Sequence, residues 1–228
     1  MTKRIALVTG ARVGLGQETA VELAKLGHDV ALVARHACTE TEERIAKEAP
    51  RVKAISYQCD IRDPEQVQAM AAKVKEDLGD VEILINNAGI YPFILFEDLD
   101  YETWKNYYAT NVDGPYNCLK AFLPAMREAG WGRVVSISSD SFMNGQEPML
   151  AGYISTKGAV IGLTRALASE YGPYGVTVNS VAPGLFVCDQ TIANIGGAPG
   201  EIPEGGLNKW DMMVNLQSIK KYPYPSDF

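Results

Sequence analysis

The chain of 228 residues has few histidines and cysteines, no excess of positive charge and no long apolar run. Its two histidines and four cysteines, with no C-x-x-C pair among them, argue against a metal centre and a disulfide framework. Lysine and arginine number 21 against 28 aspartates and glutamates, and the net charge of −7 argues against a nucleic-acid surface. No segment approaches the roughly 20 apolar residues that span a bilayer, so we expect no membrane contact.

The first residues indicate where the protein works. A strand-like segment begins at Ile5, directly after Met1, Thr2, Lys3 and Arg4, and this leaves no room for a signal peptide. We therefore expect a cytoplasmic protein.

What the sequence does contain is the composition of a folded domain in which strands and helices alternate. Apolar residues make up 46% and charged residues 21%, close to the average of globular proteins. Apolar runs predict strands at residues 5–8, 30–34, 53–57, 82–85, 133–137 and 176–181. Segments of helical period predict helices at 14–26, 39–49, 64–79, 100–129 and 151–171. This alternation predicts one α/β domain over residues 1–228, a doubly wound parallel sheet with helices on both faces.

The segment after Pro183 has a different composition. Glycine and proline are frequent at 195–200 and 203–206, which predicts a loop. In a doubly wound sheet such a loop lies at the carboxyl edge of the strands, where ligands bind.

A glycine-rich turn links the first expected strand to the first expected helix. Residues 9–16 read Thr-Gly-Ala-Arg-Val-Gly-Leu-Gly, a G-x-x-x-G-x-G spacing rather than the G-x-G-x-x-G of the dinucleotide fingerprint. Glycines here allow backbone amides and a helix N-terminus to approach a pyrophosphate. We therefore expect a dinucleotide cofactor at this turn.

Two arginines near this turn indicate which dinucleotide is bound. A carboxylate at the end of the second strand would bind the ribose hydroxyls of NAD and repel the 2′-phosphate of NADP. The sequence has Ala34-Arg35 there instead, and Arg12 lies in the glycine turn. Guanidinium groups pair well with phosphate, so we expect NADP(H) to be preferred and NAD(H) to be the alternative, unless Arg35 is an ordinary surface residue.

A Tyr-x-x-x-Lys pair places a phenol and an ammonium one helical turn apart, where the ammonium can lower the phenol pKa. The sequence has three such pairs, Tyr101/Lys105, Tyr116/Lys120 and Tyr153/Lys157. Only the third follows a strand that ends in Ser-Ile-Ser-Ser and precedes a strand that runs into Pro-Gly. We therefore expect the third pair to be functional and the other two to be surface or packing residues.

With these segments in order, the sequence resembles the short-chain dehydrogenase/reductase family over almost its whole length. The matching stretches are the glycine turn at 9–16, Asp60-Ile61, Asn86-Asn-Ala-Gly89, Asn111, Ser138-Ser139, Tyr153-Ile-Ser-Thr-Lys157 and Pro183-Gly184. The resemblance implies a Rossmann-like fold and an NAD(P)-dependent oxidoreductase acting on a small-molecule carbonyl or alcohol. It also implies a homodimer or homotetramer.

The resemblance implies roles for four residues. Tyr153 would be the general acid/base, and Lys157 would bind the nicotinamide ribose and lower the tyrosine pKa. Asn111 would support a proton relay, and a serine would hold the substrate oxygen. We expect Ser139 rather than Ser138 from the spacing after Gly132-Arg133. Adjacent strand residues face opposite ways, so only one of the two should reach the substrate.

The cofactor set implied by the glycine turn, Arg35 and the resemblance is larger. It consists of Gly10, Arg12, Val13, Gly14, Leu15, Gly16, Arg35, Asp60, Ile61, Asn87, Ala88, Gly89, Tyr153, Lys157, Pro183, Gly184 and Cys188. Cys188 stands where the family often has a threonine, and its thiol is a weaker hydrogen-bond donor than a hydroxyl.

The expected substrate wall is apolar and aromatic. Besides Ser139 and Tyr153 it consists of Tyr91, Phe93, Phe142, Met149, Leu185 and Phe186, with Trp210 to Met213 as a possible addition. Such a wall suggests a neutral hydrophobic ketone or secondary alcohol. The stretch Asn86 to Pro92 resembles the branch of the family that acts on aryl or alicyclic secondary alcohols.

Two other functions stay open. A 3-oxoacyl thioester reductase would use the same catalytic residues, and it would need a basic patch near the entrance to receive an acidic carrier, for which Arg127 and Arg133 are candidates. A non-catalytic dinucleotide-binding regulator would have the same fold without needing the tyrosine. The family's terminal strand has no counterpart here, so we also expect the sheet to end one strand early.

Overall fold

The computed structural model describes residues 2–145, 148–188, 191–192, 199 and 224. In this part of the chain, parallel strands form one sheet in the order β3-β2-β1-β4-β5-β6. The strands are β1 (Ile5–Thr9), β2 (Asp29–Ala34), β3 (Ala54–Gln58), β4 (Ile83–Asn86), β5 (Gly132–Ile137) and β6 (Val176–Val181). The helices are α1 (Gly14–Lys25), α2 (Thr39–Glu48), α3 (Pro64–Asp77), α4 (Tyr101–Tyr108), α5 (Gly114–Ala129), α6 (Ser141–Asn144) and α7 (Ala151–Tyr171). The predicted doubly wound α/β fold is confirmed.

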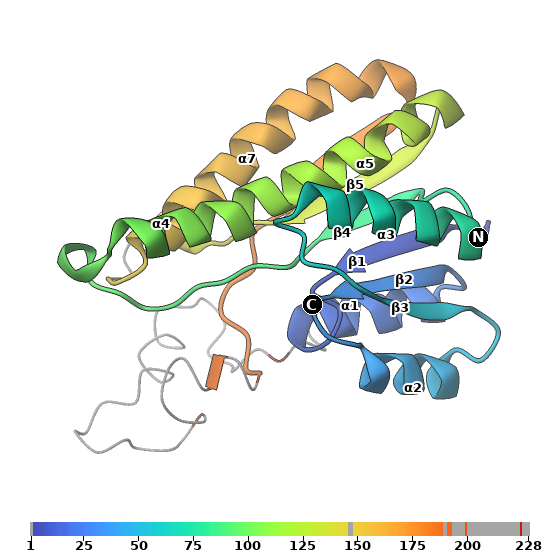
Figure 1. Cartoon of the computed structure of the whole chain (residues 1–228), viewed down its shortest axis with the longest axis horizontal. Coiled ribbons are helices and arrows are strands. Elements are labelled where there is room, and N and C mark those ends of the chain that lie inside the picture. Colours follow the sequence, from blue (N-terminus) through green and yellow to red (C-terminus); the bar gives the residue numbers. More distant parts are fainter. Residues whose placement is uncertain (1, 146–147, 189–190, 193–198, 200–223, 225–228) are drawn as a thin grey trace.

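Helices cover both faces of the sheet, which explains why its central strands are almost wholly apolar. Figure 1 shows α1 and α2 below the sheet and α3, α5 and α7 above it. On the lower face Val21 and Ile45 pack against Val30 and Leu32, and all four are buried. A second cluster, with Phe122 of α5 among its members, fills the upper face. The two clusters hold the strand ends in fixed positions, and these ends carry the site.

Local sequence signals account for several helix ends. Asp63 caps α3 by accepting hydrogen bonds from the amides of Glu65 and Gln66, and Pro64 begins the helix. Gly130 ends α5 in the left-handed conformation, with φ of 66°. Helix α7 has the predicted bounds, 151–171. The predicted loops at 195–200 and 203–206 and the segment from Trp210 to Met213 lie outside the described residues, except for position 199.

The prediction of one uninterrupted helix over 100–129 is wrong. A π-helical turn, η2 (Ala109–Asp113), separates α4 from α5, and the Gly114 amide donates to the Ala109 carbonyl five residues back. Single π-turns inside helices are frequent at functional sites. This turn contains Asn111.

The strand order fixes where a ligand can bind. The chain fills the sheet outward from β1 in one direction through β2 and β3, and in the other through β4, β5 and β6. Loops at the carboxyl ends of β1 and β4 therefore diverge to opposite faces, and a crevice opens between them. Within the described residues, none of the helices is both long and apolar enough to cross a membrane.

Candidate active site

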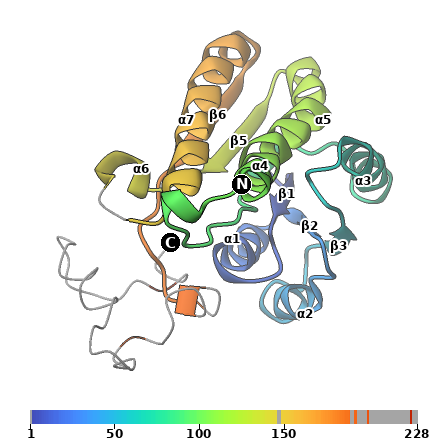
Figure 2. The ribbon, with the colours of Figure 1, turned by 60° about the vertical axis from the view of Figure 1, so that its left-hand side comes forward.

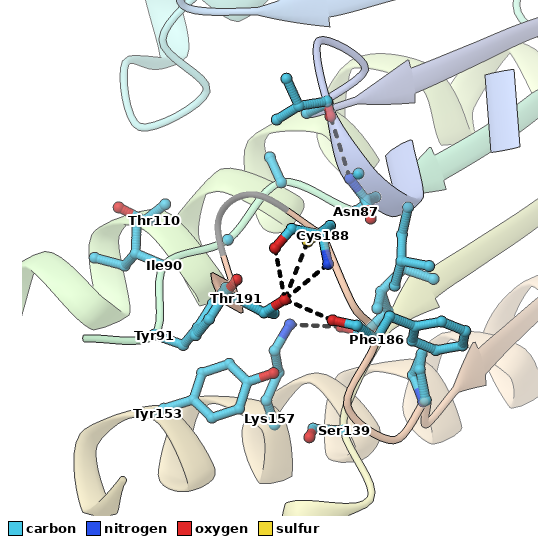
Figure 3. A pocket seen from close by; sticks show the side chains of 18 of the residues that line it. Asn87, Ile90, Tyr91, Thr110, Ser139, Tyr153, Lys157, Phe186, Cys188 and Thr191 are labelled. Carbon is cyan, nitrogen blue, oxygen red and sulfur yellow. Dashed lines mark hydrogen bonds between the residues drawn. The ribbon is translucent and has the colours of Figure 1, made fainter. Parts of the chain in front are cut away.

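A cleft of about 400 Å³ lies at the carboxyl edge of the sheet. The turn after β1 and the ends of β2 and β3 line one half of it, and the loops after β4, β5 and β6 with α7 line the other. Figure 3 shows Tyr153 and Lys157 extending from α7 into the cleft, with Tyr91, Phe186 and Ser139 around them. Residues that are far apart in the sequence therefore share one elongated cleft.

The glycine turn is tied to the end of β4. The Thr9 hydroxyl accepts hydrogen bonds from the amides of Asn87 and Ala88, at 3.0 and 3.1 Å. The Asn87 side chain donates in return to the Thr9 carbonyl, at 2.9 Å. Gly10 has φ of 69°, and a Cβ there would lie 2.8 Å from the Asn87 side-chain nitrogen. Glycine is needed because the turn packs directly on the neighbouring strand end.

A substitution at Gly16 tests whether the turn must pack this closely on the end of β4. A Cβ at Gly16 would collide with the Gly10 carbonyl oxygen and the Asn87 side-chain nitrogen. We expect Gly16→Ala to lower the melting temperature and to weaken dinucleotide binding, because the turn must move away from Asn87. Gly162→Ala on α7 is the control, since a Cβ there meets no atom within 4 Å and should stabilise the helix by about 0.5–1 kcal/mol. Thermal unfolding and cofactor titration measure both effects, and equal behaviour of the two variants would contradict the packing role.

Lys157 is buried in the floor of the cleft, with 5% of the residue exposed. Its Nζ donates to the Ile137 carbonyl at the end of β5, at 2.7 Å, and lies 5.4 Å from the centre of the Tyr153 ring. Burial lowers the Lys157 pKa from 10.5 to about 8. The Tyr153 ring also faces Tyr91, with ring centres 5.9 Å apart. The predicted Tyr153/Lys157 pair thus meets at the cleft, one helical turn apart.

The two adjacent serines follow β5 rather than ending it, so the expectation that they face opposite ways as neighbouring strand residues is wrong. Both line the cleft and both are buried. The Ser138 hydroxyl donates to the Lys157 carbonyl on α7, at 3.2 Å. The Ser139 hydroxyl instead donates to the Ser141 hydroxyl, at 3.0 Å. Ser139 stays the predicted partner of the substrate oxygen, because its hydroxyl is bound to another side chain of the cleft whereas that of Ser138 is bound to the helix backbone.

Asn111 holds the loop after β4 in place. Its side-chain oxygen accepts from the Ile90 amide, at 2.8 Å, and its nitrogen donates to the Ile90 carbonyl, at 2.9 Å. The same nitrogen donates to the Thr156 hydroxyl on α7, at 3.0 Å. A Cβ at Gly89 would lie 3.2 Å from the Asn111 oxygen and 3.7 Å from Lys157 Nζ. Asn111 is therefore beside Lys157, where it joins the π-turn, the loop and α7.

The far end of the cleft is rich in arginine. Arg12, Arg35 and Arg62 line it together with Asp60 and Ile61. The Arg62 Nε contacts both carboxylate oxygens of Asp60, at 2.9 and 3.0 Å. Arg62, and to a smaller extent Arg35, lower the Asp60 pKa. One carboxylate against three guanidinium groups leaves this end positively charged, which favours an anionic ligand.

The loop after β6 forms the roof. Predicted contacts Pro183, Gly184 and Cys188 all line the cleft. The Thr191 hydroxyl accepts from the Cys188 amide, at 2.9 Å, and donates to the Phe186 carbonyl, at 2.6 Å. A Cβ at Gly14 would lie 3.7 Å from the Cys188 sulfur, so the thiol faces the glycine turn.

Two of the predicted substrate residues do not line the cleft in the described part of the chain. Tyr91, Phe93, Leu185 and Phe186 do line it. Phe142 lies on α6, and its ring packs where a Cβ of Gly158 would stand. Met149 has φ of 70°, and its carbonyl accepts from the Ile94 amide, at 2.8 Å. The short helix α6 turns Phe142 onto α7, and Met149 joins two loops instead of facing the substrate side.

Sequence reasoning missed several residues that line the cleft. They include His36, Arg62, Asn106, Thr110, Asp140, Ser141, Leu150 and Thr191. For Arg62 a signal existed, because an arginine two residues after Asp60 can reach back to its carboxylate. For Asn106, which accepts from Arg62 at 3.0 Å, no local signal exists, since the two residues meet only in the fold.

The residues fit an elongated dinucleotide. The first turn of α1 has no side-chain cap, so its amides remain available to a pyrophosphate between the two halves of the cleft. The arginine-rich end suits an adenosine carrying phosphate, and the Tyr153/Lys157 end suits a nicotinamide. Gly14, with φ of 63°, keeps the middle open for close backbone approach. Within the described residues no group of histidine, cysteine, aspartate and glutamate could hold a metal ion.

Comparisons with known proteins return related sequences and structures. The family described as short chain dehydrogenase matches residues 4–195. The chain is 40% identical over 197 residues to nodulation protein G of Azospirillum brasilense, covering 85% of this chain and 78% of that protein. It is 37% identical over 195 residues to the 3-oxoacyl-(acyl-carrier-protein) reductase FabG of Staphylococcus aureus, with the same two coverages of 85% and 78%. Among solved structures, levodione reductase has a TM-score of 0.91 and 29% identity, covering 99% of this chain and 87% of that one.

Proposed function

The chain belongs to the short-chain dehydrogenase/reductase family, and from this premise we propose that it is an NADP(H)-preferring carbonyl reductase or alcohol dehydrogenase for neutral hydrophobic substrates. Membership makes it an NAD(P)-dependent oxidoreductase. The proposal of this substrate class rests on one observation. Ser139, Tyr153 and Lys157 line the same cleft, and the part of it proposed for the substrate is aromatic and aliphatic.

The proposed reaction divides into a part for the cofactor and a part for the protein. A bound nicotinamide supplies or accepts the hydride at the carbonyl carbon. Tyr153 gives the proton to the carbonyl oxygen in the reducing direction and takes it from the hydroxyl in the oxidising direction. Below a pH of about 8 Lys157 is charged, and its ammonium beside the ring favours the phenolate form. Ser139 holds the substrate oxygen in reach of the phenol.

The preference for NADP(H) rests on the charge at the far end of the cleft. Arg35 follows β2 where a carboxylate would bind the ribose of NAD, and Arg12 lies on the glycine turn. Both side chains are exposed, so their guanidinium groups can reach a 2′-phosphate. The Asp60 carboxylate at this end of the cleft is held by Arg62.

Arg35→Ala tests this preference. We expect the Kd for NADPH to rise by roughly tenfold, because one charge-assisted contact to the 2′-phosphate is lost, while the Kd for NADH stays nearly constant. Arg51→Ala removes another exposed arginine away from the cleft and is the control. Fluorescence titration with each cofactor gives all the values. Tighter binding of NADH than of NADPH by the unaltered protein would refute the preference.

Support for a neutral hydrophobic substrate comes from Tyr91, Phe93, Leu185 and Phe186, which line the cleft near Tyr153. The structural similarity to levodione reductase agrees with a cyclic ketone or alcohol. The test is turnover of an aryl or alicyclic ketone compared with an acetoacetyl thioester. Faster turnover of the ketone supports the proposal, and faster turnover of the thioester would replace it with the alternative below.

Reduction of a 3-oxoacyl thioester is the second candidate, favoured by the 37% identity to FabG of Staphylococcus aureus. The two arginines considered as candidates for a carrier-binding patch do not form one at the entrance. Arg133 lies at the start of β5, opposite the cleft edge, and donates to the Gly175 carbonyl, at 3.1 Å. Arg127, near the end of α5, stacks on Tyr174, with 4.1 Å between the guanidinium carbon and the ring centre. Neither arginine is at the entrance, so they offer no support for carrier binding there.

We also propose that the protein is cytoplasmic and that it assembles as a homodimer or homotetramer. Figure 2 shows the long helices α5 and α7 on the outside of the sheet, where they could meet a second copy. All four cysteines are free thiols, as is typical of a reducing compartment. Light scattering coupled to size-exclusion chromatography would measure the assembly, and a monomer at micromolar concentration would contradict it.

A further inference from the structure

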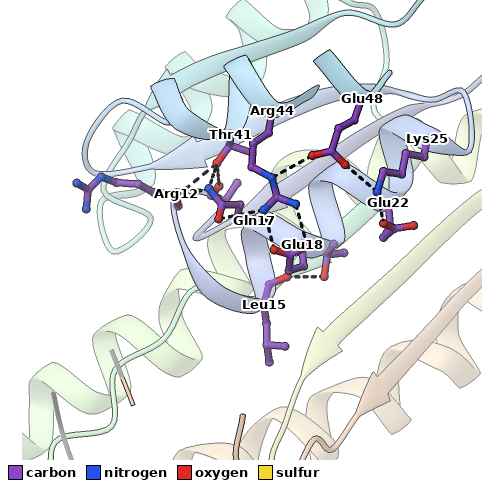
Figure 4. A network of polar contacts seen from close by, with 11 residues as sticks. Arg12, Leu15, Gln17, Glu18, Glu22, Lys25, Thr41, Arg44 and Glu48 are labelled. Carbon is purple, nitrogen blue, oxygen red and sulfur yellow. Dashed lines mark hydrogen bonds and ion pairs between the residues drawn. The ribbon is translucent and has the colours of Figure 1, made fainter. Parts of the chain in front are cut away.

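Two buried polar side chains lie directly behind the glycine turn. Gln17 on α1 is 8% exposed, and Thr41 on α2 is fully buried. Figure 4 shows both of them between the two helices, with the Arg12 side chain pointing away from them. A buried amide and hydroxyl are costly unless they form hydrogen bonds, so their partners indicate what they do.

The partners are backbone carbonyls of the turn. The Thr41 hydroxyl donates to the Ala11 carbonyl at 2.8 Å. The Gln17 side-chain nitrogen donates to the Arg12 carbonyl at 3.3 Å and to the Thr41 hydroxyl oxygen at 3.0 Å. Two consecutive carbonyls of the turn are therefore held toward the space between α1 and α2.

The direction of these carbonyls fixes the direction of the neighbouring amides. Peptide bonds in the described chain are trans, and in a trans peptide the C=O and the following N–H point opposite ways. With the carbonyls of Ala11 and Arg12 turned inward, the amides of Arg12 and Val13 are turned outward. Both residues line the cleft, so amides turned away from α1 and α2 are available to a pyrophosphate bound there.

A second layer of contacts holds the Gln17 amide in this orientation. Arg44 donates to the Gln17 side-chain oxygen at 3.4 Å, which leaves the nitrogen facing the turn. Arg44 itself is fixed by the two carboxylate oxygens of Glu18, at 2.7 and 3.1 Å. The outer members of the network, Lys25 and Glu48, are 2.8 Å apart and do not touch the turn.

We propose that Gln17 and Thr41 are positioning residues that aim the amides of the glycine turn at the pyrophosphate of the dinucleotide. They act through the backbone and touch no cofactor atom themselves. The inference rests on the cofactor site proposed above. It differs from the roles of Arg12 and Arg35, which would sense the 2′-phosphate, because the pyrophosphate is common to NAD and NADP.

Thr41→Val is the main test, since it keeps the shape and removes the hydroxyl. We expect the Kd for NADPH and for NADH to rise by the same factor, roughly tenfold, because both share the pyrophosphate. The kcat at saturating cofactor should remain near that of the unaltered protein. Thr41→Ser keeps the hydroxyl and should restore both Kd values. Gln17→Met should weaken both cofactors in the same way, and it replaces Thr41→Val in the comparison if that variant does not fold.

Two control variants separate positioning from stability. Ile45→Val removes a buried methylene from the same helix and leaves the hydrogen bonds to the turn in place, and Lys25→Gln breaks the outer ion pairs. Isothermal titration of each variant with NADPH and NADH, beside its melting temperature, gives the result. Wild-type affinity in Thr41→Val and Gln17→Met, or an equal loss in Ile45→Val, would overturn the positioning role alone. An unaltered protein that binds neither cofactor would contradict the proposed function itself.

Discussion

Tyr153→Phe is expected to lower kcat by roughly 10² to 10⁴-fold, because it removes the hydroxyl that exchanges a proton with the substrate oxygen. The ring itself stays, with its contacts to Tyr91 and to the Lys157 ammonium. The Kd for NADPH should therefore change little. Steady-state kinetics with a neutral cyclic ketone and fluorescence titration of the cofactor give the two values.

Tyr101→Phe is the matched control. Tyr101 and Lys105 form another Tyr-x-x-x-Lys pair, with Lys105 Nζ 5.1 Å from the ring centre, but Tyr101 is 71% exposed and lies outside the cleft. The control should keep the kcat of the unaltered protein. A Tyr153→Phe variant with full kcat would remove the phenol from the mechanism, whatever the control does.

Lys157→Met is expected to abolish activity and to stabilise the protein at neutral pH. The charged ammonium is buried, and a fall in pKa from 10.5 to about 8 corresponds to roughly 3 kcal/mol. The variant also leaves the Ile137 carbonyl without its 2.7 Å donor, and this loss offsets about 1 kcal/mol of the gain in stability. The free energy of unfolding should rise by about 2 kcal/mol, because the apolar side chain has no charge to desolvate.

The gain from Lys157→Met should depend on pH in a defined direction. Between pH about 8 and 10.5 unfolded Lys157 holds a proton that the folded state has lost, so this residue's contribution to stability rises with pH across that window. Methionine lacks this dependence. The gain over the unaltered protein is therefore largest below pH 8 and shrinks above it.

Urea unfolding at neutral pH and again above pH 8 measures this gain. Lys120→Met, at an exposed position on α5, should change stability little at either pH. A Lys157→Met variant that is less stable than the unaltered protein at neutral pH would show that burying the Lys157 ammonium does not lower the free energy of unfolding.

Much of the fold could be predicted because its signals are local. Apolar runs, Asp63-Pro64 and the glycine at 130 mark strand and helix ends through backbone chemistry that needs no tertiary contact. The π-turn around Asn111 could not be predicted from a helical period, because the bonds from Asn111 to Ile90 and Thr156 arise only when α7 and the loop after β4 meet. Tertiary contacts decide such a turn.

The candidate site divides in the same way. Tyr153 and Lys157 could be found because the order of strands around them identifies the carboxyl edge of the sheet. Phe142, expected in the substrate wall, does not line the cleft in the described part of the chain, because its direction depends on α6, a four-residue helix without a clear sequence signal. Sequence reasoning missed Gln17 and Thr41 because they contact the turn on its side away from the cleft. A polar residue on a helix usually faces water, so nothing in the sequence marks this role.

The most direct test of the central claim is a panel of carbonyl substrates assayed with NADPH and with NADH. The account predicts that the protein consumes NADPH when a neutral hydrophobic ketone is present, does so more slowly with NADH, and loses this turnover in Tyr153→Phe. Tight dinucleotide binding without consumption of either cofactor across the whole panel would contradict it and would point to a dinucleotide-binding regulator.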